Sequence, residues 1–242
     1  MEAAAASVLT RAVEMDKKER YTMALVLYQE GVQILLDTIK ETKEVRKVEY
    51  LTSKAKEYLD RAEKVKELIS RRKSIGTYRE LSRIEDGSTG HGYASVFGRF
   101  LDATVTHIDI EDPYIRVFHQ CQNLVRLCEL AVQKCSALTS ISLLTTCIAE
   151  EHNGQEQITR LAELKESLAN RNIAFDFSFS ETLHDRQIKL SNGWVIKIGR
   201  GLDYFKAPEG KFVLGSCDLE LRPCLETTVD IFHKNQLKGG AN

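Results

Sequence analysis

The stretch DATVTHIDIEDPYIRVFHQCQNLVRLCELAVQKCSALTSISLLTTCI, residues 102–148, decides the class of fold for most of the chain. Its first part alternates apolar and polar residues and stops at Pro113, which indicates a β-strand. From Tyr114 to about Cys135 the apolar residues recur at helical spacing, and residues 140–148 then indicate a buried strand. A strand, a helix and a strand joined by a crossover of this length form a βαβ unit with parallel strands. The sequence therefore predicts an α/β domain.

The same alternation of helix and strand continues along the chain. A second helix is predicted over residues 155–170, and IAFDFSFS, residues 173–180, alternates as a strand does. In HDRQIKLSNGWVIKIGRGLD, residues 184–203, two apolar strands flank a Ser-Asn-Gly turn, which predicts a β-hairpin. His184 and Arg186 stand where the hairpin begins, and α/β sheets place ligand sites at strand ends. The alternative is that both are merely charged residues facing water.

Residues 1–72 have a different pattern, with no proline and one glycine. Apolar residues recur at helical spacing in three segments, residues 8–13, 24–39 and 51–69. Three such helices with short polar connections predict an antiparallel three-helix bundle. The predicted fold class of the whole chain is thus α + α/β, a helical bundle followed by an α/β domain with a mixed sheet.

The third helix carries more apolar surface than a bundle core requires. At about 100° per residue, Leu59 lies about 40° beyond Ala55, at the edge of the apolar stripe, and charged residues border it. A strip of this kind suits a second amphipathic helix that carries leucines and an arginine or lysine. The alternative is that Leu59 belongs to the core and the charges form a solvated face. The residues assigned to the predicted strip are Ala55, Leu59, Asp60, Ala62, Glu63 and Lys66.

Residues 73–91 are predicted to be a linker, because Gly76, Gly87, Gly90 and Gly92 occur there among serines and threonines. The domains expected on either side are residues 1–72 and residues 92–242.

Composition excludes several classes of function. The net charge of −1 argues against a general basic footprint for nucleic acid. No run approaches the ~18 apolar residues of a membrane span, and MEAAAASV lacks the features of a signal peptide. The six cysteines show no CxxC spacing, so buried thiols in a reducing cytosol are expected rather than zinc or disulfides. No metal or cofactor is expected.

ALVLYQEGVQILL, residues 24–36, followed by KAKEYLDRAEKVKELI, residues 54–69, closely resembles MIT domains, the microtubule-interacting and transport bundles. The segment YLDRAEKVK is a specific match. The resemblance implies binding of the C-terminal tail helices of ESCRT-III subunits in a groove between the second and third helices. Leu59 occupies the groove leucine of that family, and Asp60 and Glu63 occupy its acidic partners for arginine or lysine of the tail.

HDRQIKLSNGW, residues 184–194, is similar to a degenerate phospholipase D motif, in which His-x-Lys is followed by four residues and Asp. That chemistry needs a histidine to attack phosphorus, a cation to neutralise phosphate oxygens and a second histidine to protonate the leaving alcohol. His184 matches the nucleophile and Arg186 replaces the lysine, but Ser191 stands in the aspartate position and the motif occurs once. The chain is therefore predicted not to be an enzyme. The alternative is a phosphodiesterase that uses His184 from both subunits of a homodimer.

With IGRGLDYF, residues 198–205, this stretch also resembles the phospholipase-D-like domain that follows an MIT domain in a family of adaptors of cytokinesis and endosomal sorting. The resemblance implies binding to phosphoinositide membranes without hydrolysis, formation of a homodimer, and a cytoplasmic protein recruited peripherally to late endosomes and the midbody. A protein scaffold without lipid contact is a third possibility. The residues assigned to lipid contact are His184, Arg186, Lys189, Lys197, Arg200 and Lys206.

Overall fold

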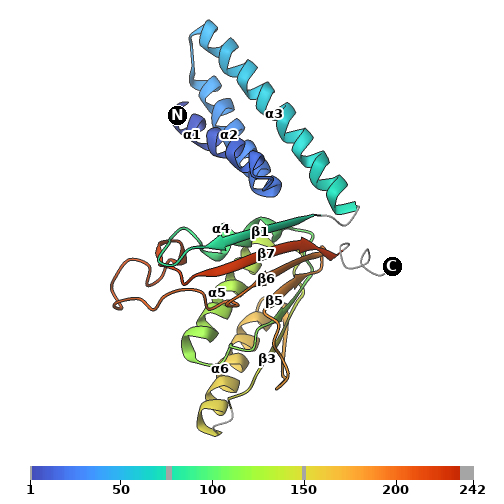
Figure 1. The fold of residues 1–242 in the computed structure, drawn as a ribbon, viewed down its shortest axis with the longest axis vertical. Helices are drawn as coiled ribbons and strands as arrows, with labels where there is room; N and C mark the ends of the chain where they lie inside the picture. Colours follow the sequence, from blue (N-terminus) through green and yellow to red (C-terminus); the bar gives the residue numbers. More distant parts are fainter. Residues whose placement is uncertain (1, 75–77, 149–150, 235–242) are drawn as a thin grey trace. The chain divides into compact units, whose positions relative to one another are not determined.

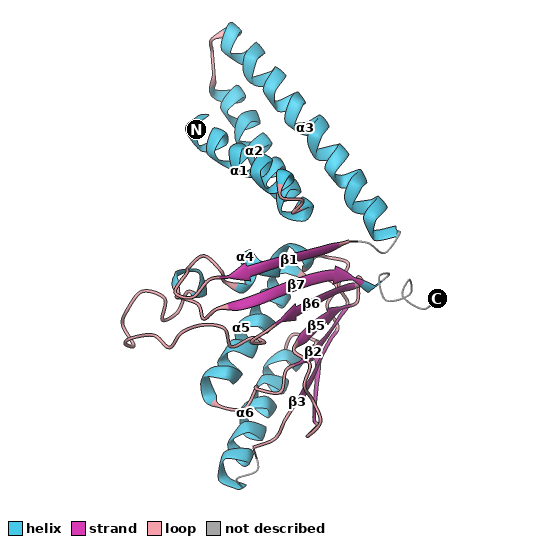
Figure 2. Cartoon of the chain, viewed as in Figure 1, coloured by secondary structure: helices cyan, strands magenta, loops and turns pink. Residues whose placement is uncertain are grey.

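The computed structural model describes residues 2–74, 78–148 and 151–234. The chain divides into two units, a helical unit and a compact α/β domain that spans residues 81–234. Figure 2 shows the difference between them, because one is built of helices alone and the other of strands and helices.

The helical unit contains α1 (Glu2–Lys17), α2 (Tyr21–Glu41) and α3 (Val45–Ser74), which confirms the three predicted helices. α2 packs against both α1 and α3. A Cβ on Gly31 of α2 would lie only 2.6 Å from Leu9 Cγ of α1, so the glycine lets the two helices approach closely. The buried residues of α3 keep the predicted helical spacing and are Leu51, Ala55, Ala62, Val65 and Ile69.

The α/β domain is built on a seven-stranded sheet in the order β1-β7-β6-β5-β2-β3-β4 (Figure 1). β2, β3 and β4 are parallel, whereas β5 pairs antiparallel with β2 and with β6, and β6 pairs antiparallel with β7. This arrangement confirms the predicted mixed sheet. The strands are β1 (Arg79–Ile84), β2 (His107–Glu111), β3 (Ser140–Thr145), β4 (Ala174–Phe179), β5 (Gln187–Leu190), β6 (Trp194–Ile198) and β7 (Thr227–His233).

Two long helices form the crossovers of the parallel strands. α5 (Phe118–Lys134) joins β2 to β3, and α6 (Glu151–Ala169) joins β3 to β4. Because right-handed crossovers that step in one direction lie on one side of a sheet, both helices cover the same face. Ile108 and Ile110 of β2 are buried and alternate with polar residues that are only half-buried, so the other face of β2 is polar. The short α4 (Tyr93–Phe97) precedes β2.

The hairpin predicted over residues 184–203 is confirmed. β5 and β6 pair antiparallel with Ile188 opposite Ile196. Gly193, in the turn, has φ +94°, and a Cβ there would lie 2.4 Å from Nε2 of His233. Both facts require glycine at this position.

The linker predicted over residues 73–91 is wrong in part, because α3 continues to Ser74 and β1 occupies Arg79–Ile84 at the edge of the sheet. In β1 only Leu81 and Ile84 are apolar, and Leu81 is exposed. An edge strand with so little apolar surface lacks the alternation that marks a strand in sequence, and the glycines around it suggested a flexible segment.

Two further expectations need correction. The helix expected from Tyr114 begins at Phe118, because the Asp112 carboxylate accepts a hydrogen bond from the Tyr114 N–H (3.0 Å) and holds a turn before it. The cysteines are free thiols, and burial raises the pKa of Cys128 to about 12, but Cys147 and Cys217 are exposed rather than buried.

Candidate functional site: a helix face and a sheet edge

A partly buried ion pair fixes the rotation of α3 in the helical unit. Arg61 donates two hydrogen bonds to the Asp16 carboxylate of α1, at 2.7 and 2.8 Å, and the Tyr28 hydroxyl of α2 donates a third at 3.0 Å. Burial alone would raise the pKa of Asp16, but these hydrogen bonds outweigh it and lower that pKa. Arg61 belongs to the motif YLDRAEKVK, and its structural role was not predicted from the sequence.

Because Arg61 faces α1, the predicted strip lies on another side of α3. Leu59 is about 160° around the helix from Arg61, and its side chain is 46% exposed, which places it outside the core. Asp60 is exposed, and Glu63 pairs with Lys66 at 3.6 Å on the surface. The structure thus brings Leu59 and these three charged residues together on one exposed face.

The two alanines assigned to this strip are placed differently. Ala55 and Ala62 are only 3% and 6% exposed, because they lie in the middle of the apolar stripe that packs into the bundle. They therefore lie beneath the strip rather than on it. Leu36 of α2, which is 39% exposed, was not assigned to a binding surface from the sequence. It lies about 140° around α2 from Gly31, which faces α1, so its position could have been derived from the same helical period.

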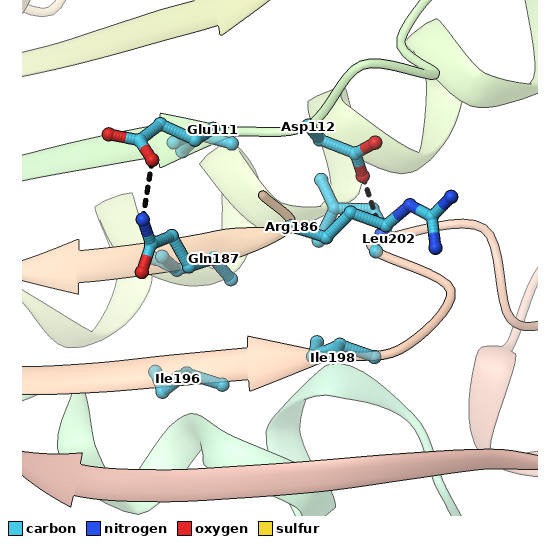
Figure 3. A pocket seen from close by; sticks show the side chains of 10 residues that line it. Glu111, Asp112, Arg186, Gln187, Ile196, Ile198 and Leu202 are labelled. Atoms are coloured by element: carbon cyan, nitrogen blue, oxygen red, sulfur yellow. Dashed lines mark hydrogen bonds between the residues drawn. The ribbon is translucent and has the colours of Figure 1, made fainter. Parts of the chain in front are cut away.

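In the α/β domain, several chain segments that are distant in sequence meet at one end of the central strands, here called the sheet edge. The ends of β2 and β6 and the beginning of β5 lie there, as their pairing requires. Figure 3 shows Asp112 beside Arg186, and Glu111 bonded to Gln187 across the two strands. The cavity that they line between the strands holds only about 10 Å³, roughly the room for one water molecule, so it is not a ligand site.

The buried Asp112 organises this edge. Its carboxylate accepts a hydrogen bond from the N–H of Leu202 (2.9 Å) as well as from Tyr114. Gly201 adopts φ +65°, and a Cβ there would lie 2.0 Å from Asp112 Oδ2. Burial raises the pKa of Asp112, although the two N–H groups oppose that shift. The carboxylate therefore fixes the Gly-Arg-Gly loop to the end of β2.

Two arginines of the predicted lipid set share one surface hollow of about 210 Å³. Arg186 stacks its guanidinium over the Tyr114 ring at 4.5 Å and donates to the Gly199 carbonyl. Its buried Nε has no hydrogen-bond partner among the described residues. Arg200 donates through Nε to the Glu226 carbonyl at 3.0 Å. The residues that line the hollow are Tyr114, Gln120, Arg186, Arg200 and Asp203.

The hollow is also lined by a carboxylate, that of Asp203. Asp203 is held by side chains from the first turns of α5: His119 at 3.2 Å, Gln120 at 3.1 Å and Asn123 at 3.1 Å. None of these residues, nor Tyr114, was assigned to the site from sequence. Their positions follow from contacts between residues about 80 apart in the chain, for which no local pattern gives a signal.

Both halves of the chain match known families. The family described as the phospholipase D-like domain at the C-terminus of MIT matches residues 90–233, and the MIT (microtubule interacting and transport) domain matches residues 2–67. MIT domain-containing protein 1 of Mus musculus is 48% identical over 235 residues, which cover 97% of this chain and 94% of that protein. The chain belongs to the family of MIT proteins with a phospholipase D-like C-terminal domain. The resemblances to MIT domains and to the phospholipase-D-like domain that follows an MIT domain are confirmed.

Within the phospholipase D-like domain of this family member, the motif residues do not meet. His184 is exposed, and no contact in the described part of the chain orients its ring. Ser191 lies at the other end of β5, where its Oγ accepts hydrogen bonds from the N–H groups of Thr106 (2.8 Å) and His107 (3.2 Å). The serine therefore holds the start of β2, far along the strand from His184.

The three lysines assigned to lipid contact lie outside the hollow, and each lies beside a carboxylate. Lys189 pairs with Glu111, Lys197 lies 3.8 Å from Asp185, and Lys206 pairs with Asp86 at 2.7 Å. Burial would raise the pKa of Glu111, but hydrogen bonds from Lys189 and Gln187 lower it. The six residues assigned to lipid contact thus do not form one free basic patch.

In residues 2–74, 78–148 and 151–234, no cluster of His, Cys, Asp and Glu could hold a metal ion. None of the helices in that part of the chain has the length and apolarity to cross a bilayer.

Proposed function

We propose that this protein is an adaptor that binds ESCRT-III C-terminal tail helices through its MIT unit and phosphoinositide membranes through its phospholipase D-like domain, without hydrolysing the lipid. Membership of the family supports the adaptor architecture. The exposed strip of Leu59, Asp60 and Glu63 carries the first half of the proposal, and the hollow of Arg186 and Arg200 carries the second.

The strip on α3 has the chemistry of a helix-binding surface. A leucine that is 46% exposed can accept the apolar face of a partner helix, and the carboxylates of Asp60 and Glu63 can pair with lysine or arginine beside that face. No shape change of the bundle is required, since all three side chains already lie on the surface.

Binding of peptides that correspond to ESCRT-III C-terminal helices tests this half. We expect Leu59→Asp to weaken binding at least about a hundredfold, because it removes apolar contact and adds a charge to a surface that must be desolvated. The matched control is Tyr50→Asp, which adds the same charge to an exposed residue about 180° around α3. Equal binding by both variants, with helicity intact, would assign the tail to another surface.

The hollow at the sheet edge supports the membrane half. The two guanidinium groups that line it offer donors to phosphate oxygens, and arginine binds phosphate through a planar fork. The carboxylate of Asp203, which also lines the hollow, limits how many anionic groups can enter. This chemistry suits a phosphorylated inositol headgroup better than a diffuse anionic surface.

Flotation of the full chain with phosphatidylcholine vesicles, with and without a phosphoinositide, tests this half. At about 1 kcal/mol for each cation near the surface, Arg186→Gln with Arg200→Gln should weaken binding about thirtyfold. Arg171→Gln is the control, because this exposed arginine lies between α6 and the start of β4, at the other end of the parallel strands. Phosphatidylserine vesicles of equal charge separate headgroup recognition from general attraction.

The absence of hydrolysis has its own readout in the same tubes. A nucleophilic histidine needs a partner that orients its ring, and none of the described residues does so for His184. We therefore expect no released headgroup, whether the protein is monomeric or a homodimer. Release that disappears in His184→Ala would establish the phosphodiesterase instead.

We propose the cytoplasm as the setting, with peripheral recruitment to late endosomes and the midbody during endosomal sorting and cytokinetic abscission. The family resemblance carries this step, and self-association as a homodimer would strengthen two weak contacts through avidity. Imaging of the tagged protein in dividing cells tests it: wild type should reach the midbody and Leu59→Asp should not.

A further inference from the structure

The loop that follows β6 carries the most exposed apolar side chains of the described chain. Phe212 is 101% exposed, Leu214 is 87% exposed and Val213 between them is 43% exposed. Single exposed apolar residues are ordinary on protein surfaces, but three in succession at a loop tip form a patch that marks an interaction site. None of the residues assigned above to protein or lipid contact lies on this tip.

The exposure of the tip is built into the fold. The buried Arg222 donates to the carbonyls of Gly215 and Ser216, and Ser216 Oγ donates to the Gly210 carbonyl at 2.9 Å. Gly215 adopts φ +82°, and a Cβ there would lie 3.0 Å from Arg222 Cα. A buried arginine thus closes the loop beneath Phe212, and the apolar side chains are held away from the domain.

The tip lies at the same edge of the sheet as the arginine hollow. The loop leaves the sheet after β6, where Arg200 lies, and returns through the Phe205–Cys224 bridge to the start of β7. Figure 1 shows this orange-red loop standing out from the end of the sheet. Lys211, directly before Phe212, is exposed as well. Apolar and cationic groups therefore occur together at one edge of the domain.

We infer that Phe212, Val213 and Leu214 insert into the interfacial region of a lipid bilayer while Arg186 and Arg200 hold anionic headgroups. This inference rests on the proposed membrane function and adds an apolar anchor to it. A projecting tip with cations behind it complements the layered chemistry of a bilayer, where anionic headgroups overlie hydrocarbon. Three residues reach only the boundary of the hydrocarbon, so the loop backbone can remain hydrated.

Tryptophan fluorescence tests the insertion directly. The chain has one tryptophan, Trp194, which is 3% exposed, so wild type provides the blank. In full-length Phe212→Trp, we expect emission to shift to the blue on phosphoinositide vesicles and to be quenched by lipids with brominated acyl chains, while the Trp194 signal stays unchanged. Binding without any quenching of the new tryptophan would overturn the inference.

Binding measurements provide the second readout. Phe212→Ser with Leu214→Ser should weaken vesicle binding about a hundredfold, at about tenfold for each side chain removed from the bilayer. Leu81→Ser, a control at an exposed leucine of β1, should leave binding unchanged. Wild-type affinity in the double variant, combined with lost self-association in light scattering, would assign the tip to a protein contact and overturn the inference.

The two sets of variants distinguish the apolar anchor from the membrane function on which it rests. If Arg186→Gln with Arg200→Gln loses binding and the loop variant does not, the membrane function stands and the anchor is wrong. If wild type binds no vesicle of any composition, the membrane function itself fails, and the anchor fails with it.

Discussion

On α3, Leu59, Asp60 and Glu63 stand on the surface of a helix whose rotation is fixed from the other side by Arg61. At the edge of the sheet, by contrast, Arg186 is fixed by the Tyr114 ring and the Gly199 carbonyl. The side chains of the first surface project from the bundle and are not needed to hold it together. In the second surface, the side chains that line the hollow also make contacts that stabilise the domain.

This difference predicts how each surface responds to substitution. Changes on the exposed strip of α3 should alter binding and leave stability almost untouched, because those side chains make few contacts within the bundle. Changes around Asp112 should alter stability and binding together, since its carboxylate accepts the hydrogen bond that holds the loop containing Arg200.

The largest effect is expected for Gly201→Ala. A left-handed conformation costs about 1–2 kcal/mol in a residue with a Cβ. The new Cβ would also lie 2.0 Å from Asp112 Oδ2, so we expect a total loss above about 3 kcal/mol. Gly90→Ala is the matched control, because Gly90 has φ +80° but nothing within 4 Å of its Cβ position. Denaturant titration followed by Trp194 fluorescence reports on this domain; equal small losses would show that Asp112 does not hold the loop.

The next effect concerns the ion pair that positions the strip on α3. Asp16→Ala leaves Arg61 and Tyr28 without their acceptor and should destabilise the helical unit by about 2 kcal/mol, a value reduced because Arg61 is partly exposed. Hydrogen exchange of α1–α3 amides in the full chain measures it. Glu14→Ala, an exposed neighbour on α1, should change little. Equal protection in both variants would mean that another contact fixes α3.

The same pair predicts a pH dependence. The pKa of Asp16 is lower in the folded unit than in the unfolded chain, so its stabilisation is complete above the unfolded value of about 3.9 and is lost as pH falls through the folded value. Wild type should therefore lose more protection in α1–α3 on acidification than Asp16→Ala does. Parallel losses would assign the acid sensitivity to other carboxylates.

The contrast also explains what could be predicted from sequence. The position of Leu59 follows from the helical period, and the hairpin follows from alternation around the Asn-Gly turn. Asp112 and Asp203 could not be assigned, because their partners Leu202 and Asn123 are 80 to 90 residues away. Likewise, the sequence shows Lys189 as a free cation and does not show that β2 places Glu111 beside it.

The smallest effect is expected where sequence and structure differ most, at Lys189. Replacing Lys189 and Glu111 together by glutamine keeps the net charge and removes a partly exposed ion pair, so vesicle affinity should stay within about twofold and stability within about 1 kcal/mol. Arg200→Gln alone should weaken binding about fivefold. If the double variant loses as much as Arg200→Gln, then Lys189 leaves its carboxylate to contact lipid. The lipid-binding surface would then extend over the face of the hairpin that bears Lys189 and Lys197, as their alternation with apolar residues predicts.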